Sequence, residues 1–359
     1  FAFGIGHVVL VFDNLRQTLR VVVPARVTHD VDEAYDAANR VIEETVVKLG
    51  KPTRLPRLEL PSREDVRDLP ASSFSRPAFE DAVRTCQEHI RAGDIFQVVL
   101  SQRFELPRAG LDPLEVYRIL RVTNPAPYMV LCELASAAIA GASPEVLVRV
   151  DGPPGERELT VRPIAGTRRR GIDVAEDRAL EAELLADPKE RAEHVMLVDL
   201  GRNDVGRVSL PGSVRVPHAF VIERYSRVMH IVSQVVGALR PELGALDALR
   251  ATFPAGTLSG APKIRALEII DALEPASRGW YGGAVGYLGY DGAADFAICI
   301  RSVVFAGDAV RVQAGAGIVY DSDPAAEDAE CHAKASAVLR AIAIARADGE
   351  GADAGEGEG

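Results

Sequence analysis

The sequence predicts an α+β fold with antiparallel β-sheets, and three observations lead to that expectation. Segments with the apolar alternation typical of strands come in consecutive runs, not singly between helices. Turn sequences such as Asp291-Gly292 and Gly307-Asp308 suit hairpins between antiparallel neighbours. The chain has 359 residues and is 47% apolar, so it can bury one large core or two ordinary ones.

The first 76 residues are expected to lie outside the main domain. Two short strands are predicted within residues 7–24, and an amphipathic helix follows over residues 31–49. The chain begins without Met inside a strand-like pattern, so residues 1–50 are interpreted as the remnant of an incomplete N-terminal region. Prolines recur from position 52 onward and indicate an extended connector over residues 51–76.

The main domain is predicted to span residues 77–346. Helices are expected at 79–90, 112–122, 174–200 (as a pair), 244–252, 262–273 and 324–345. Strands are expected at 95–106, 127–134, 137–150, 156–166, 213–223 and 228–239, and a three-stranded meander is predicted between Trp280 and Tyr320. Residues 347–359 are acidic and rich in glycine, so they are expected to form a disordered tail.

The composition argues against several classes of protein. A net charge of −11 disfavours nucleic acid as a partner. No apolar run reaches about 18 residues and no signal peptide is visible, so no membrane association is expected. The cysteines Cys86, Cys132, Cys299 and Cys331 are far apart in sequence, which disfavours structural zinc and a disulfide framework. Together these features favour the reducing cytoplasm.

Two acidic patterns are candidates for binding a metal ion. Glu327, Glu330 and Lys334 recur at intervals of three and four, so they share one face of the last predicted helix. Carboxylates there could hold Mg²⁺, which also accepts water and substrate oxygens, or they could simply suit the helix dipole. Glu190 and Glu193 form a second pair, and the absence of HExxH spacing argues against zinc.

For three other motifs, the sequence alone leaves two interpretations open. The Gly-rich turn before Lys263 could hold an anion at a helix N-terminus, or it could serve only as a cap. His230 lies in a predicted strand and could be catalytic or a core histidine. The three arginines at 168–170 could bind an anion or form a solvated face. No P-loop, GxSxG elbow or complete dinucleotide fingerprint is present.

Nine segments, taken in order, resemble the chorismate-utilising enzymes, most closely the synthase subunits of anthranilate synthases. The resemblance covers about residues 77–340. It implies a fold of two packed, mainly antiparallel β-sheets flanked by helices. The segments are "GDIFQVVLSQRF", "NPAPYMVLCEL", "SPEVLVRV", "PIAGTRRRG", "AEHVMLVDLGRNDVGRV", "YSRVMHIVSQVVG", "FPAGTLSGAPKIRALEIID", "RGWYGGAVGYLGYDG" and "AGAGIVYDSDPAAEDAECHAKA".

The resemblance implies roles for individual residues. Glu145 would protonate the departing ring hydroxyl of chorismate, and His230 and Thr257 would lie beside the ring as catalytic residues. The magnesium ligands would be Glu193, Glu327 and Glu330, and the ion would grip a substrate carboxylate. The implied substrate-binding residues are Thr167, Tyr281, Arg301, Gly315, Gly317 and Lys334. The arginines at 168–170 would lie outside the site and pair with acidic helices.

The resemblance also implies a reaction. It is the Mg²⁺-dependent amination of chorismate at ring carbon two, followed by elimination of pyruvate to give anthranilate for tryptophan biosynthesis. Ammonia would come from a glutamine amidotransferase subunit, within a homo- or hetero-oligomer. The alternatives are component I of aminodeoxychorismate synthase, a salicylate or isochorismate synthase, and a non-catalytic chorismate-binding subunit.

Two positions favour ammonia as the attacking group. Gln97 stands where the water-using relatives carry a lysine that can deprotonate water. Ala165 stands where typical aminodeoxychorismate synthases carry a lysine that can attack the ring. Relatives also bind tryptophan, through a Ser-containing motif and an "NPAPYM" strand. Only the second part is found here, so a partial effector site and weak or absent inhibition by tryptophan are expected; its residues are Asn124, Pro125, Tyr128 and Met129.

Overall fold

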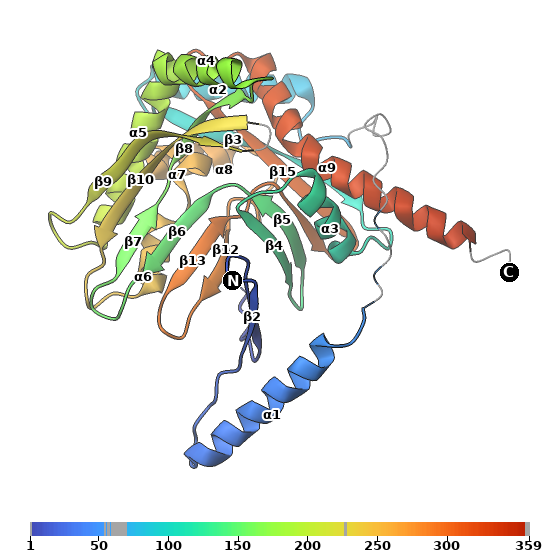
Figure 1. The fold of residues 1–359 in the computed structure, drawn as a ribbon. Coiled ribbons are helices and arrows are strands. Elements are labelled where there is room, and N and C mark those ends of the chain that lie inside the picture. The colour runs from blue at the N-terminus through green and yellow to red at the C-terminus, as the bar shows by residue number, and fades with distance from the viewer. Residues whose placement is uncertain (1, 54, 56–57, 59–69, 226–227, 356–359) are drawn as a thin grey trace. The chain divides into compact units, whose positions relative to one another are not determined.

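The computed structural model describes residues 2–53, 55, 58, 70–225 and 228–355 (Figure 1). The chain divides into two compact units, Phe1–Glu59 and Leu60–Gly359. Much of the connector predicted over residues 51–76 lies outside the described residues. Among the helices that the structure describes, none is long and apolar enough to span a membrane.

The first unit contains one hairpin and one helix. The hairpin pairs β1 (Val9–Asp13) with β2 (Thr18–Val22) in antiparallel fashion. The helix is α1 (Val31–Leu49), which Asp30 caps by accepting hydrogen bonds from two amides of the first turn. None of the α1 side chains is buried, so the helix adds nothing to a closed core within this unit.

The second unit is built on two antiparallel sheets, as the sequence predicts. The seven-stranded sheet has the order β12 (Ala284–Leu288), β13 (Ala294–Ile298), β6 (Val146–Asp151), β7 (Glu158–Val161), β10 (Val228–Ala238) and β8 (Ile164–Arg169), and β9 (Arg215–Arg224) also pairs with β10. The six-stranded sheet has the order β11 (Gly260–Ala261), β3 (Gln97–Pro107), β15 (Ala309–Ile318), β14 (Ser302–Ala306), β5 (Ala138–Ser143) and β4 (Tyr128–Glu133). The predicted α+β class is confirmed.

Helices pack against both sheets and complete the hydrophobic cores (Figure 1). Leu159 and Val235 are fully buried in the core of the seven-stranded sheet, and Phe79 and Leu100 are fully buried beside the six-stranded sheet. The helices of this unit are α2 (Arg76–Arg91), α3 (Pro113–Thr123), α4 (Val174–Ala186), α5 (Pro188–Gly206), α6 (Ala245–Thr252), α7 (Gly256–Ser259), α8 (Lys263–Leu273) and α9 (Pro324–Gly355).

The predicted three-stranded meander between Trp280 and Tyr320 is wrong. This segment forms two hairpins, β12 with β13 and β14 with β15, and they belong to different sheets. The chain changes sheets after β13, where Arg301 has a φ of 50°. That left-handed conformation is uncommon for a residue with a side chain, and it turns the backbone out of the ladder that a continuous meander would need.

The strand predicted over residues 137–150 also divides between the two sheets. Its first part is β5 of the six-stranded sheet, and its second part is β6 of the seven-stranded sheet. The two crossovers are joined by hydrogen bonds: the amide of Ile298 donates to the carbonyl of Glu145 (3.0 Å), and the amide of Ala142 donates to the carbonyl of Arg301 (3.1 Å). Glu145 and Arg301 therefore both stand where the chain passes from one sheet to the other.

The last helix is longer than predicted. The backbone of α9 continues as helix to Gly355, where a disordered tail was expected from residue 347. This part of the sequence contains no proline, and each glycine costs a helix only about 1 kcal/mol relative to alanine. The final residues, 356–359, lie outside the described part of the chain.

Candidate active site

A cavity of about 600 Å³ opens between residues of both sheets, α5 and α9. Its volume suits a small-molecule ligand. All the residues to which the resemblance assigns catalytic, substrate-binding or metal-binding roles line it: Glu145, Thr167, Glu193, His230, Thr257, Tyr281, Arg301, Gly315, Gly317, Glu327, Glu330 and Lys334. The fold thus brings together residues that are far apart in sequence, such as Glu145 and Lys334, which are 189 positions apart. The individual roles of these residues stay predictions.

Glu145 is a buried carboxyl group at the first crossover between the sheets. It is 8% exposed, and the hydroxyl of Thr257 donates a hydrogen bond to it at 2.9 Å. Burial raises the pKa of Glu145 to about 8, against the lowering effects of Thr257 and of the charge on Lys334. Near neutral pH this carboxyl group is therefore largely protonated and can act as an acid.

His230 and Thr167 face each other across the antiparallel pair β10 and β8. The Nδ1 atom of His230 lies 3.0 Å from the carbonyl oxygen of Gly166 and 3.1 Å from the hydroxyl of Thr167. Because a carbonyl oxygen can only accept, Nδ1 carries the hydrogen, and Nε2 is the unprotonated atom of the neutral ring. Burial lowers the pKa of His230, which favours that neutral form.

Two cations mark one part of the cavity. Arg301 lines the cavity, and within the described part of the chain its guanidinium has no hydrogen-bond or ion-pair partner. Burial lowers the pKa of Arg301, and the nearby Tyr281 and Glu330 oppose this by raising it. The ammonium of Lys334 donates to the carbonyl of Gly315 (2.9 Å) and forms an ion pair with Glu330 (2.5 Å). Since guanidinium stays charged in proteins, Arg301 is available to an anion.

Several carboxylates also line the cavity. Burial raises the pKa of Glu193, and the nearby charges of Glu190 and Glu330 raise it further. Burial also raises the pKa of Glu327, with a further contribution from Glu330. A cation placed among these carboxylates would lower the pKa of both Glu193 and Glu327 again, because it favours their charged form. The donor set consists of carboxylate oxygens, which is the chemistry that Mg²⁺ prefers.

The carboxylates do not form a preassembled metal cluster. Among the residues that the structure describes, no three His, Cys, Asp or Glu side chains are close enough together to hold a metal ion. The oxygen donors of Glu193, Glu327 and Glu330 therefore fit Mg²⁺ only as part of a coordination shell that water and substrate oxygens complete, which is a common arrangement for this ion.

Gln97 and Ala165 also line the cavity. The amide nitrogen of Gln97 donates to the carboxylate of Glu193 at 3.2 Å. Its oxygen, Oε1, is buried and has no hydrogen-bond partner among the described residues, and the residue is only 3% exposed. The side chain of Ala165 offers no polar atom at all. Gln97 can thus accept a hydrogen bond from a bound group but cannot remove a proton from water.

Sequence reasoning missed two polar residues of the cavity. Lys189 lines it from the first turn of α5, and its charge lowers the pKa of both Glu193 and Glu327. Gln313 lines it from β15 and donates to the hydroxyl of Ser101 at 2.8 Å. A signal existed for Lys189, because the sequence contains few lysines and this one directly precedes the Glu190 and Glu193 pair.

The predicted effector residues lie elsewhere. Tyr128 and Met129 begin β4, at one end of the six-stranded sheet, and Asn124 follows the last turn of α3. The hydroxyl of Tyr128 donates to the carboxylate of Asp295 at 3.1 Å. Neither these residues nor Pro125 lines the large cavity, and tryptophan binding by them stays a prediction.

The structure decides between the alternatives for the other motifs. The arginines at 168–170 form ion pairs with acidic residues of α4, of α5 and of the junction between them, as predicted. Arg168 pairs at 3.1 Å with Glu190, which lines the cavity. Lys263 pairs with Asp204 at 2.8 Å, so it is not free to hold an anion.

The fold and the site define a class of protein. The chain belongs to the family described as chorismate binding enzyme, which matches residues 1–340. Among its curated relatives is anthranilate synthase component 1 of Aquifex aeolicus, which is 49% identical over 338 residues, a span of 94% of this chain and 67% of the relative. The corresponding protein of Pseudomonas aeruginosa is 50% identical over 342 residues, or 95% of this chain and 68% of the relative.

A solved structure supports the same relationship. The crystal structure of anthranilate synthase component I from Streptococcus pneumoniae superimposes with a TM-score of 0.76 at 42% sequence identity. The match covers 92% of this chain and 71% of that chain. The expected chorismate-utilising fold is therefore confirmed, and so is the resemblance to anthranilate synthases.

Proposed function

We propose that this chain is the synthase component of an anthranilate synthase. It combines chorismate with ammonia and releases anthranilate, pyruvate and water, and it acts as a lyase in tryptophan biosynthesis. The observation that carries this proposal is one cavity that holds an unpartnered guanidinium, a protonated carboxyl group and a group of carboxylates. Relatives of this chain that share about half of its residues are named anthranilate synthase component 1.

Chorismate is a dianion, so the cavity must supply positive charge inside an acidic protein. Arg301, which has no protein partner among the described residues, binds one carboxylate of the substrate. Lys334 stands near it and can share that carboxylate or the enolpyruvyl group. Tyr281, Gly315 and Gly317 complete the surface against which the substrate lies.

The second carboxylate of the substrate lies toward Glu193, Glu327 and Glu330. These three residues would hold Mg²⁺. When bound, the ion supplies the positive charge that lets a substrate carboxylate approach the acidic side chains. The chain itself contributes the position of these oxygens, on α5 and α9, and the charge of Lys189, which lowers the pKa of Glu193 and Glu327.

Bond breaking begins with a proton from Glu145. A hydroxyl group is a poor leaving group until it is protonated, and the Glu145 carboxyl still carries its proton near neutral pH. Thr257 orients the carboxyl through a 2.9 Å hydrogen bond. His230 and Thr167 line the same cavity and provide a neutral polar surface for the ring.

Ammonia forms the new bond at ring carbon two. It is already a nucleophile and needs no base, which agrees with Gln97 and Ala165 at the two positions that distinguish the family's reactions. The buried, unpartnered Oε1 of Gln97 can accept a hydrogen bond from the incoming ammonia. Loss of pyruvate then leaves the aromatic product.

The ammonia comes from a separate glutamine amidotransferase component. The designation component 1 in the relatives' names supports a partner component, and the two components together form a hetero-oligomer. The four free cysteines support a location in the reducing cytoplasm.

The proposed function is tested by identifying the products of the purified chain. With chorismate, ammonium and Mg²⁺, we expect fluorescent anthranilate and pyruvate in equal amounts, and we expect turnover to disappear when Mg²⁺ is chelated. Chromatographic detection of 4-amino-4-deoxychorismate would instead identify an aminodeoxychorismate synthase, and salicylate would identify a water-using relative. Chorismate binding by calorimetry without any turnover would identify a non-catalytic subunit.

A further inference from the structure

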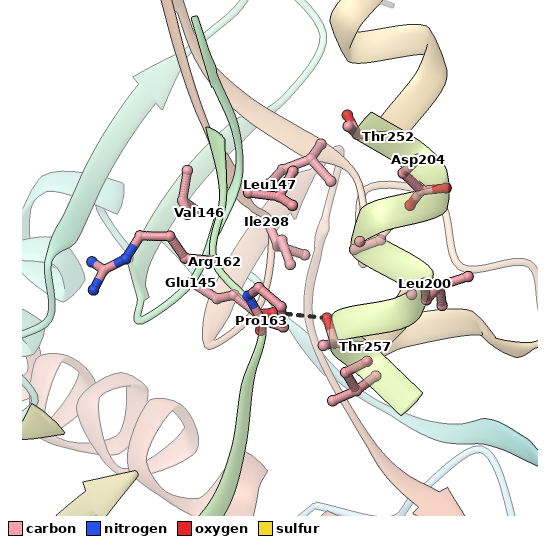
Figure 2. Close-up of a pocket in the computed structure, with 15 residues that line it drawn as sticks. Glu145, Val146, Leu147, Arg162, Pro163, Leu200, Asp204, Thr252, Thr257 and Ile298 are labelled. Carbon is pink, nitrogen blue, oxygen red and sulfur yellow. Dashed lines mark hydrogen bonds between the residues drawn. The ribbon is translucent and has the colours of Figure 1, made fainter. Parts of the chain in front are cut away.

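A second, smaller cavity of about 40 Å³ lies beside Glu145 (Figure 2). It is lined by residues of β6, β7, β13, α5, α6 and α7 and by residues that directly flank some of these elements. Glu145, Leu197 and Thr257 line both this cavity and the large one, so the two cavities adjoin beside these residues. The small cavity is far too small for chorismate but has room for at least one water molecule.

Asp204 lines the small cavity and has an unsatisfied carboxylate oxygen. Asp204, on α5, is 5% exposed, and its Oδ2 accepts a hydrogen bond from Lys263 at 2.8 Å. Its other oxygen, Oδ1, is buried and has no hydrogen-bond partner among the residues that the structure describes. Leaving such an atom unpaired costs about 1–3 kcal/mol or more. A water molecule in the cavity removes that cost, because it can donate to Oδ1.

The position of this oxygen matters because of what Glu145 must do in each turnover. This step rests on the proposed function. Once Glu145 has given its proton to the leaving hydroxyl, it is a buried carboxylate that must regain a proton. Substrate or product then fills the large cavity and separates Glu145 from solvent on that side. The substrate is too large to enter the small cavity, so water held there can stay beside Glu145 during this time.

We propose that the small cavity holds ordered water between Asp204 Oδ1 and the Glu145 carboxyl, and that Asp204 is the positioning residue of a proton path that recharges Glu145. Lys263 first gives a proton to the Asp204 carboxylate, and the protonated Asp204 then passes this proton through the water to Glu145. The Lys263 side chain is 12% exposed and regains its proton from solvent. That proton balances the one which the attacking ammonia releases, so the charge of the enzyme is unchanged after a turnover.

The charges around Asp204 suit this role. Burial raises the pKa of Asp204, whereas the charges of Lys263 on α8 and of Arg207 after α5 lower it. These opposing effects allow the carboxylate to accept a proton briefly and to give it up again. At Glu145, the hydrogen bond from Thr257 and the charge of Lys334 likewise lower the pKa, whereas burial raises it.

Filling the small cavity tests the proposal without touching the large one. Gly201 lines only the small cavity, and a methyl group added there would meet the side chains of Val161, Val235 and Pro163 at 3.2, 3.6 and 3.7 Å. Alanine also favours the α5 helix over glycine. Gly206→Ala is the matched control, because Gly206 ends the same helix and lines neither cavity. Among the described residues, only Val214 would lie within 4.0 Å of the added methyl group.

For Gly201→Ala we expect kcat to fall by roughly 10-fold or more, since proton transfer by a positioned group is worth about 100-fold or more. The KM for chorismate and the unfolding temperature should stay near those of Gly206→Ala, and the solvent deuterium isotope effect on kcat should rise. Equal kcat and isotope effects in the two variants would overturn the proposal, while the products of the wild-type chain would still decide the proposed function.

A second variant and a direct observation complete the test. Asp204→Asn keeps the shape of the side chain and should lower kcat and shift its pH profile with little change in KM. If it fails to fold because Lys263 loses its partner, Asp204→Asn combined with Lys263→Met provides the measurement. A high-resolution crystal structure should show water bonded to Asp204 Oδ1. An empty cavity there would overturn the proposal whatever the enzyme produces.

Discussion

At the scale of single residues, Glu145 shows how the fold sets the chemistry of a side chain. An exposed glutamate is ionised above its ordinary pKa, and so is Glu145 in the unfolded chain. The folded chain keeps Glu145 protonated until about pH 8 because it is buried. The unfolded chain therefore releases the Glu145 proton at a lower pH than the folded chain does. As a result, the free energy of unfolding decreases as the pH rises from the ordinary pKa of glutamate to about 8.

Glu145→Gln separates these two effects. The amide cannot donate a proton as an acid does, so we expect kcat to fall by about 100-fold to 10,000-fold. It also carries no charge, so the variant should unfold at a higher temperature than the wild type at pH 9 and at a similar temperature at pH 5. Thermal unfolding at both pH values, with turnover measured beside it, checks both results. An active variant, or one that is less stable at pH 9, would contradict this account of Glu145.

The predictability of the site differs from residue to residue for physical reasons. The spacing of Glu327, Glu330 and Lys334 predicts one helix face, and the structure places all three on the cavity. The hydrogen bond from Gln97 to Glu193 joins residues 96 positions apart, and no local pattern contains it. Only the resemblance to a known family connected these positions before the fold was known.

At the scale of the elements, β15 supports the cavity by having no side chains at two positions. Gly315 and Gly317 are two residues apart, so both face the same side of the sheet. A methyl group on Gly315 would lie 2.9 Å from the carbonyl oxygen of Leu100 and 3.0 Å from the hydroxyl of Tyr281. A methyl group on Gly317 would lie 2.5 Å from the amide nitrogen of Gln97.

Alanine at these two positions should have different effects. In Gly315→Ala the methyl group meets backbone, so we expect a loss of about 1–3 kcal/mol of stability and a KM for chorismate that rises roughly 10-fold. In Gly317→Ala the methyl group meets the end of a flexible side chain, so stability should change little while kcat falls. Denaturant unfolding and steady-state kinetics distinguish the two. The prediction fails if Gly315→Ala binds chorismate as the wild type does.

The order of the helices and strands along the chain could be predicted better than which strands pair with each other in the sheets. Apolar periodicity located most helices and strands to within a few residues. It did not reveal that the segment from Trp280 to Tyr320 serves two sheets, because the apolar alternation resumes after the break and only the backbone at Arg301 changes. The crossovers that carry Glu145 and Arg301 are set by contacts between distant strands, so the local sequence does not encode them visibly.

At the scale of the whole molecule, the global charge and the local charge have opposite signs. The chain carries a net charge of −11, yet its cavity is proposed to receive a dianion. Arg301, Lys334 and Lys189 supply the local positive charge, and the acidic residues that face the cavity suit Mg²⁺. The overall negative charge favours solubility, whereas binding of an anion in the cavity depends on the positions of these three cationic side chains.

The cysteines also limit what the chain can do alone. A thiol attacks an amide only as the thiolate, and burial opposes ionisation. Burial raises the pKa of Cys86 and Cys331 to about 12 and that of Cys299 to about 11, and it also raises the pKa of the half-buried Cys132. None of the four thiols of this chain is therefore suited to release ammonia from glutamine.

Glutamine should for this reason fail as a nitrogen source for the isolated chain, whereas ammonium should succeed. We expect anthranilate from chorismate, Mg²⁺ and ammonium, at a rate that rises with pH as more free ammonia forms and then falls as Glu145 ionises near pH 8. Addition of a glutamine amidotransferase component should make glutamine effective and should not alter the product. Anthranilate from glutamine in the absence of that component would show that this chain contains a glutaminase centre of its own. It would also mean that the burial of its thiols does not keep them unreactive.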